Sequence, residues 1–167
     1  MIWITGLSGS GKTTFANALY QRLKDVHPVV VLDGDCVRAI MGDDMGYDLD
    51  SRKIMGWRMA RLCQYLTKQN LGVICATISM HKEIHAFNRE NQMAYCEVLI
   101  DVALENLIRR DKNHLYSRAL HHEIANVVGV DIPFDKPEHP DVVMDNNDYS
   151  GLEEKVDQLL RSIKHIL

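Results

Sequence analysis

Residues 1–19 read MIWITGLSGSGKTTFANAL, and this stretch decides the fold. An apolar run over residues 2–4 predicts a short buried strand, glycines at positions 6, 9 and 11 interrupt it, and a helical pattern begins at Lys12. The spacing G-x-x-x-x-G-K-[ST] between a strand and a helix is that of a phosphate-binding loop, or P-loop. The alternative, a glycine-rich turn that happens to precede a helix, leaves the agreement between motif and context unexplained.

A P-loop binds the phosphates of a nucleoside triphosphate together with Mg²⁺. Glycines let the backbone turn tightly and bring bare N–H groups close to an anion, and the amino end of a helix favours negative charge. We therefore expect a nucleoside triphosphate as co-substrate, which the resemblance described below makes ATP, and Mg²⁺ as cofactor. The residues expected at the phosphates are Gly6, Leu7, Ser8, Gly9, Ser10, Gly11, Lys12, Thr13 and Thr14.

The composition is that of an ordinary globular protein, with 46% hydrophobic and 25% charged residues in a chain of 167. A net charge of −4 argues against nucleic acid as the main partner. No apolar run approaches the ~20 residues of a membrane-spanning helix, and we expect no signal peptide, since no basic region or cleavage site is visible before the first predicted strand. The four cysteines form no C-x-x-C pair, which predicts reduced thiols. We expect a cytoplasmic protein with no membrane partner.

Five apolar runs alternate with segments of helical spacing, which is typical of an α/β fold. The runs cover residues 2–5, 29–33, 72–79, 95–102 and 141–145. Such strands form a parallel sheet with helices on both faces, and ligands bind beyond the carboxyl ends of the strands. We predict a single P-loop domain over residues 1–167 with a five-stranded sheet. Ser150 and Glu153 have the spacing of a capping box at the last helix.

The segment LDGDCVR, residues 32–38, follows the second predicted strand and places two aspartates beside the P-loop. Phosphoryl transfer needs an acceptor hydroxyl held in line, a group that takes its proton, and positive charge around the phosphoryl group. Asp35 would accept the hydroxyl proton, Asp33 would hold Mg²⁺ through water, and Arg38 would hold a phosphate of the acceptor. The alternative is an acidic turn that caps a helix, a role that aspartate fills well.

At these residues the chain resembles the adenylylsulfate (APS) kinases. The segments GLSGSGKTT, LDGDCVR, RDKNHLYSRAL and VVGVDIPFDKPEHPDVVMD match, in the same order, blocks that read approximately GLSGSGKTT, LDGDNVR, RDPKGLYKKA and FTGIDDPYEAPENPELVLD in that family. The resemblance implies a P-loop kinase that transfers the γ-phosphate of ATP to the 3′-hydroxyl of a nucleotide. It also implies a homodimer, with a small-molecule nucleotide and ATP as the other partners.

The resemblance assigns roles to individual residues. Lys12 and Thr13 would serve the triphosphate and Mg²⁺, and Asp35 would be the catalytic base. Arg38 and Arg52 would hold acidic groups of the acceptor, and Ser79 would abut the acceptor or the γ-phosphate. The resulting catalytic residues are Asp35, Lys12 and Arg38, and the metal-binding residues are Thr13 and Asp33.

A basic stretch within residues 109–126 corresponds to the lid of that family, which closes over both substrates. A lid excludes water, which would otherwise compete as a phosphate acceptor. By the resemblance Arg110 would contact ATP, Lys112 would contact the acceptor, and Leu115 and Tyr116 would form the apolar part of the lid. The alternative is a solvated basic helix face, which applies most readily to Arg118.

The departures from the family concentrate in the acceptor pocket. SRKIMGWR, residues 51–58, replaces D-R-x-x-N-I-R-R, so that Met55 stands for an asparagine and Trp57 for an arginine. Two aromatic rings sandwich adenine in the family. Here one of the two positions is Tyr47, and the other is occupied by Val127, which has no ring. Trp57 would supply a replacement ring or would pack on its helix face. The complete set of predicted acceptor residues is Asp33, Arg38, Tyr47, Arg52, Met55, Trp57, Ile78, Ser79, Lys112, Leu115 and Val127.

These changes leave the acceptor open. Stacking of a base on an aromatic ring is worth ~1–3 kcal/mol, and a charge-assisted hydrogen bond about 1.5–3 kcal/mol. The first expectation is APS; the alternative is cytidine diphosphoramidate, the acceptor of a related group of kinases in surface-polysaccharide modification. A nucleotide-dependent switch is disfavoured because Asp35, Arg38 and Arg52 supply a base and a grip on an acceptor.

Overall fold

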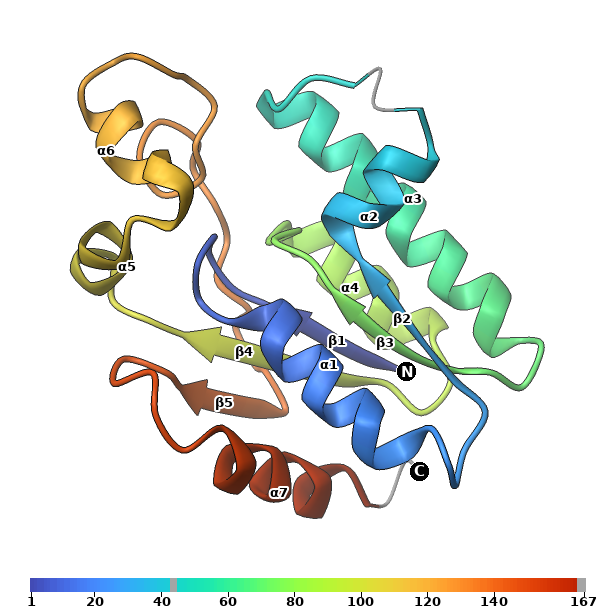
Figure 1. Cartoon of the computed structure of the whole chain (residues 1–167). Helices are drawn as coiled ribbons and strands as arrows, with labels where there is room; N and C mark the ends of the chain where they lie inside the picture. Colours follow the sequence, from blue (N-terminus) through green and yellow to red (C-terminus); the bar gives the residue numbers. More distant parts are fainter. Residues whose placement is uncertain (43–44, 165–167) are drawn as a thin grey trace.

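The computed structural model describes residues 1–42 and 45–164, which form a single α/β domain. The strands are β1 (Ile2–Thr5), β2 (Val29–Asp33), β3 (Gly72–Ala76), β4 (Cys96–Asp101) and β5 (Val142–Asp145). They form one parallel sheet in the order β2-β3-β1-β4-β5 (Figure 1). The predicted fold is confirmed, although β3, β4 and β5 are shorter than the apolar runs that predicted them.

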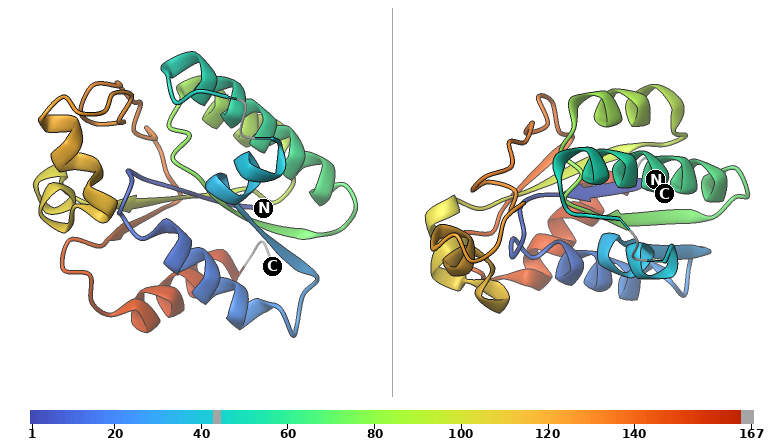
Figure 2. Two further views of the ribbon diagram at one scale, coloured as in Figure 1. Left: turned by 45° about the horizontal axis from the view of Figure 1, so that its top comes forward. Right: turned by 90° about the horizontal axis from the view of Figure 1, so that it is seen from above.

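Seven α-helices and one 3₁₀ helix, η1, connect or follow the strands in the described residues. They are α1 (Lys12–Leu23), α2 (Gly34–Ile40), α3 (Leu49–Thr67), α4 (Lys82–Asn91), α5 (Leu104–Arg110), η1 (Lys112–His114), α6 (Leu115–Leu120) and α7 (Leu152–Ile163). The helices α1 and α7 cover one face of the sheet, and α3 and α4 cover the other (Figure 1 and Figure 2). No helix in the described part of the chain is long and apolar enough to cross a membrane.

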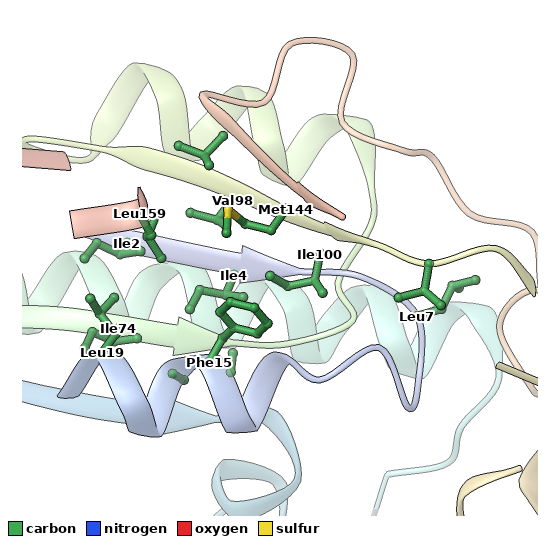
Figure 3. Close-up of a cluster of buried hydrophobic side chains, with 14 of the residues drawn as sticks. Ile2, Ile4, Leu7, Phe15, Leu19, Ile74, Val98, Ile100, Met144 and Leu159 are labelled. Carbon is green, nitrogen blue, oxygen red and sulfur yellow. The ribbon is translucent and has the colours of Figure 1, made fainter. Parts of the chain in front are cut away.

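The alternation of side chains along β1 divides the core into two halves. Ile2 and Ile4 point toward Phe15 and Leu19 of α1 and toward Leu159 of α7 (Figure 3). The ring of Trp3 points the other way, into a cluster with residues of α3 and α4 that include Met59, Cys63 and Ile84. Burial on both faces explains why β1 is apolar at every position.

The capping box predicted for the last helix is wrong. The N-cap residue of α7 is Gly151, which has a φ of +64°, and no side chain caps the helix there. Ser150 Oγ instead donates to Asp148 Oδ2 at 2.7 Å. Asp148 also accepts a hydrogen bond from the Ser150 N–H at 3.2 Å. The serine therefore belongs to the turn before the helix, because an aspartate two residues earlier competes for its hydroxyl.

The strand register brings the polar ends of the strands to one edge of the sheet. Asp33 pairs with Ala76, Ala76 also pairs with Ile4, and Asp101 pairs with Asp145. The loops that follow these strands therefore meet at the same rim, as the sequence predicted. The segment from α5 to α6 lies at the same end of the molecule (Figure 2).

Candidate active site

A pocket of about 580 Å³ opens at the carboxyl edge of the sheet, where the P-loop, the ends of β2 and β3, α3 and the segment after α5 meet. Most of the predicted site residues line it. The lining consists of Ser8, Gly9, Gly11, Lys12, Thr13, Thr14, Asp33, Gly34, Asp35, Arg38, Tyr47, Arg52, Met55, Gly56, Ala76, Thr77, Ile78, Ser79, Arg110, Lys112 and Tyr149. Gly6, Leu7 and Ser10, which were also predicted at the phosphates, are buried parts of the loop that do not line the pocket.

The P-loop takes its shape from backbone conformations that favour glycine. Gly6 has a φ of +148°, and a Cβ atom built there would lie 2.6 Å from the carbonyl oxygen of Ile100. Gly11 has a φ of +104° immediately before α1 begins. Asn146, on the loop after β5, donates from Nδ2 to Ser10 O at 2.8 Å and supports the P-loop from behind. The loop is thus preformed around the amino end of α1, which favours a bound anion.

The side chain of Lys12 lies within the P-loop. Its ammonium nitrogen donates to Leu7 O at 2.8 Å. Burial, and to a smaller extent the nearby positive charge of Lys112, lower the pKa of Lys12 to about 8, although Asp35 and Asp33 act in the opposite direction. A bound polyphosphate would favour the charged form of this lysine.

Asp33 and Asp35 have different surroundings. Asp33 is the N-cap residue of α2, and its Oδ1 accepts from the N–H groups of Asp35 at 3.0 Å and Cys36 at 3.4 Å. Its Oδ2 accepts from Thr13 Oγ1 at 2.7 Å. Asp33 therefore combines the helix-capping role with a metal-compatible position, while Asp35 is exposed at the pocket and available to an acceptor hydroxyl.

Thr13 and Asp33 present hard oxygen ligands beside the P-loop. Mg²⁺ is usually bound by one or two protein oxygens, substrate phosphates and water, not by a cage of protein ligands. The described residues contain no group of three or more His, Cys, Asp or Glu side chains that could hold a metal by itself. The donor set therefore fits a magnesium ion that arrives with a nucleotide.

Arg38, Tyr47 and Arg52 form the acceptor side of the pocket. The Arg38 guanidinium is 4.5 Å from the centre of the Tyr47 ring, and that of Arg52 is 5.4 Å from it. Arg38 donates to the carbonyls of Met45 at 3.0 Å and Gly46 at 3.1 Å, and Arg52 donates to Tyr47 O at 2.7 Å. Burial and the neighbouring Arg38 lower the pKa of Arg52. Two cations beside one exposed ring suit an anionic ligand that carries a base.

Three predicted acceptor residues do not line the pocket. The Trp57 ring packs edge-on against Phe87 of α4 at 5.2 Å between ring centres, and the Arg61 guanidinium lies 5.5 Å from its centre. Val127 is 3% exposed in the core, and Leu115 packs against the same cluster. The structure thus favours the packing alternative for Trp57, because its position on α3 faces α4.

Sequence reasoning missed the contribution of the loop after β5. Tyr149 lines the pocket, and the Arg110 guanidinium lies 4.7 Å from the centre of its ring. Arg110 also donates to Asn146 O at 2.5 Å and Asn147 O at 2.9 Å. The available signal was positional, since any loop that follows a parallel strand reaches this edge of the sheet. Gly56 and Thr77 were also missed.

The comparisons with known proteins agree with this geometry. The family model described as adenylylsulphate kinase matches residues 1–145. The chain is 44% identical over 164 residues to a cytidine diphosphoramidate kinase of Campylobacter jejuni, with 98% of this chain and 95% of that protein covered. It is 35% identical over 167 residues to an adenylyl-sulfate kinase of Chloroflexus aurantiacus, with coverages of 99% and 89%.

A solved structure is similar over nearly the whole chain. The APS kinase of Mycobacterium tuberculosis, in complex with AMPPNP and APS, superposes with a TM-score of 0.87 at 28% identity and covers 98% of this chain and 96% of that one. The motif, the fold and the relatives all indicate phosphoryl transfer from ATP. The protein is therefore a phosphotransferase and belongs to the adenylylsulphate kinase family.

Proposed function

We propose that this kinase transfers the γ-phosphate of ATP to the 3′-hydroxyl of cytidine diphosphoramidate. The observation that carries the proposal is the remodelled acceptor side. There Tyr47 lies beside Arg38 and Arg52, Val127 is buried and Trp57 faces α4, while the second aromatic ring among the described lining residues, Tyr149, lies by Arg110. An acceptor side with one ring beside its two arginines matches a pyrimidine at least as well as a purine. The higher identity to the Campylobacter jejuni kinase, 44% against 35% for the adenylyl-sulfate kinase, supports the same choice.

The donor half of the site would hold the triphosphate in the P-loop. Backbone N–H groups and Lys12 would neutralise the β- and γ-phosphates, and Thr13 and Asp33 would hold Mg²⁺. When bound, the ion would neutralise charge on the phosphates and orient them. Arg110, which lines the pocket and bonds the loop after β5, would contact the same nucleotide.

The acceptor half would place the 3′-hydroxyl beside Asp35. The carboxylate would accept the hydroxyl proton as the oxygen attacks the γ-phosphorus in line with the departing ADP oxygen. Arg38, Arg52 and Lys112 would hold the acidic groups of the acceptor, and Met55, Ile78 and Ser79 would form the wall behind it. Closure of residues 109–126 as a lid would exclude water.

The proposal is tested by ATP turnover with cytidine diphosphoramidate and with APS, measured side by side at matched low concentrations. A higher kcat/KM for cytidine diphosphoramidate is expected. A clear preference for APS would overturn the choice of acceptor and would make APS, the second candidate, the substrate. Rejection of both nucleotides while ATP still binds would leave the kinase fold intact and refute both acceptors.

Two expectations from the sequence stay predictions beside this proposal. One is a homodimer, which the family resemblance implies. The other is a cytoplasmic location.

A further inference from the structure

Gly56 occupies an unusual position in the wall of the pocket. It lies in the interior of the 19-residue helix α3 and is buried. Glycine is the poorest helix former after proline, because it loses the most backbone freedom on folding. A buried glycine at mid-helix therefore calls for a packing reason.

The reason is the close approach of Ser79 and Ile84. A Cβ atom built at Gly56 would overlap Ser79 Oγ and would lie 2.6 Å from Ile84 Cδ1. Any side chain at position 56 must therefore displace one or both of these groups. The missing side chain of Gly56 forms a notch in α3 that receives the hydroxyl of Ser79.

Two side chains hold the backbone around Ser79 by hydrogen bonds. His85 Nε2 lies 3.0 Å from Ser79 O, and since a carbonyl only accepts, this nitrogen carries the hydrogen. Thr5 Oγ1 donates to Ile78 O at 3.0 Å. The other imidazole nitrogen of the buried His85 is 3.6 Å from the buried carboxylate of Glu97. A side chain at position 56 would therefore move the hydroxyl of Ser79, the end of the Ile84 side chain or both, and not the backbone of Ser79.

The hydroxyl itself has an unmet hydrogen-bonding capacity. Ser79 is 8% exposed, and its Oγ has no hydrogen-bond partner among the described residues. A buried polar group without a partner is unfavourable. Ser79 and Gly56 both line the pocket, so a bound acceptor is the available partner for this hydroxyl.

We propose that Gly56 is a specificity-determining residue for the acceptor: its notch in α3 keeps the hydroxyl of Ser79 out of the acceptor's space and in position to bond it. The proposal rests on the proposed function, since it assigns a role within the same pocket. A larger residue at position 56 would rotate the hydroxyl of Ser79 and reduce the space that the pocket leaves for the acceptor nucleotide. The P-loop, on the other side of the pocket, would not change.

The test uses the Gly56→Ala enzyme with ATP and both candidate acceptors. We expect KM for the preferred acceptor to rise at least about tenfold, which corresponds to about 1.4 kcal/mol, while KM for ATP stays within about twofold. Gly72→Ala is the matched control, because a Cβ there would meet neighbours at 3.4 Å or more, away from the pocket. It should leave both KM values unchanged.

A double variant separates this role from a general loss of structure. Ser79→Ala removes the oxygen that the new Cβ would meet and leaves only the contact with Ile84 Cδ1, so Gly56→Ala should raise the acceptor KM clearly less in that background. An unchanged acceptor KM in Gly56→Ala, a parallel rise of both KM values, or an equal rise with and without Ser79 Oγ would each overturn the proposal. Wild-type enzyme that accepts neither nucleotide would instead refute the proposed function, and the inference with it.

Discussion

Asp35 is the residue on which turnover depends in the proposed reaction. We expect Asp35→Asn to lower kcat by about 10²–10⁴-fold, because the amide cannot take the hydroxyl proton. Binding of ATP should stay nearly unchanged, since the N–H of residue 35 still bonds Asp33 Oδ1. Steady-state kinetics and calorimetry measure the two effects.

A matched control for this variant is Asp50→Asn. Asp50 lies in the first turn of α3, as Asp35 lies in the first turn of α2, but it does not line the pocket. It should keep wild-type turnover. Turnover of Asp35→Asn at the wild-type rate would refute the assignment of the base.

The lowered pKa of Lys12 predicts that ATP binding depends on pH. Its lowered pKa means that the free protein loses this charge as the pH rises through about 8. A bound triphosphate favours the protonated form, so binding takes up a proton above that pH, and the Kd for ATP should rise by up to about tenfold per pH unit. Calorimetry in two buffers of different ionisation enthalpy measures the uptake. Lys12→Ala should bind ATP weakly and without this proton uptake; wild-type binding with no uptake above pH 8 would contradict the prediction.

A variant of Trp57 tests whether this side chain packs in the core or contacts the acceptor. Because its ring packs on Phe87 and lies outside the pocket, we expect Trp57→Ala to lower the free energy of unfolding by about 1–3 kcal/mol. The acceptor KM should stay within about twofold. Urea denaturation measures the stability, and initial rates measure the acceptor KM. A large rise of this KM at unchanged stability would show that Trp57 contacts the acceptor.

At the scale of elements, α4 holds the loop before β5 against the sheet. Arg89 donates to both carboxylate oxygens of Asp141 at 3.2 Å and to Glu97 Oε2 at 3.3 Å, and Glu97 is 2% exposed. Lys82, at the start of the same helix, pairs with Glu138 at 2.6 Å where both side chains are exposed. Removal of the Arg89 side chain leaves the buried carboxylate of Glu97 without this cation, whereas removal of the Lys82 side chain affects only the exposed carboxylate of Glu138.

We therefore expect Arg89→Ala to lower the free energy of unfolding by about 2 kcal/mol or more. Lys82→Ala, the control on the same helix and loop, should cost less than about 1 kcal/mol. Equal losses in urea denaturation would show that burial of Glu97 does not matter to this contact.

At the scale of the whole molecule, the site is assembled from six separate stretches of chain. The P-loop, the end of β2, the end of β3, α3 and the loops around α5 and β5 converge only because the sheet is parallel and all its strands end at one edge. Arg110 and Tyr149 illustrate this, since they are far apart in the sequence yet stack beside the P-loop.

The sequence by itself determined the fold class, the five strands and the chemistry of the phosphate half. These follow from local patterns: the period of apolar residues, the glycines that a tight loop requires, and a lysine and threonine next to them. Asp33 and Asp35 were also accessible, because they directly follow a predicted strand. Their neighbours in the sequence are largely their neighbours in space.

Only the tertiary structure decided the acceptor half. Periodicity places Trp57 and Gly56 on α3, but which segment each one meets depends on how α3 packs against α4 and the end of β3. The same holds for Val127, which is buried in the core, and for Tyr149, which reaches the pocket. Contacts between residues distant in sequence depend on the packing of whole elements, and no local pattern carries that information.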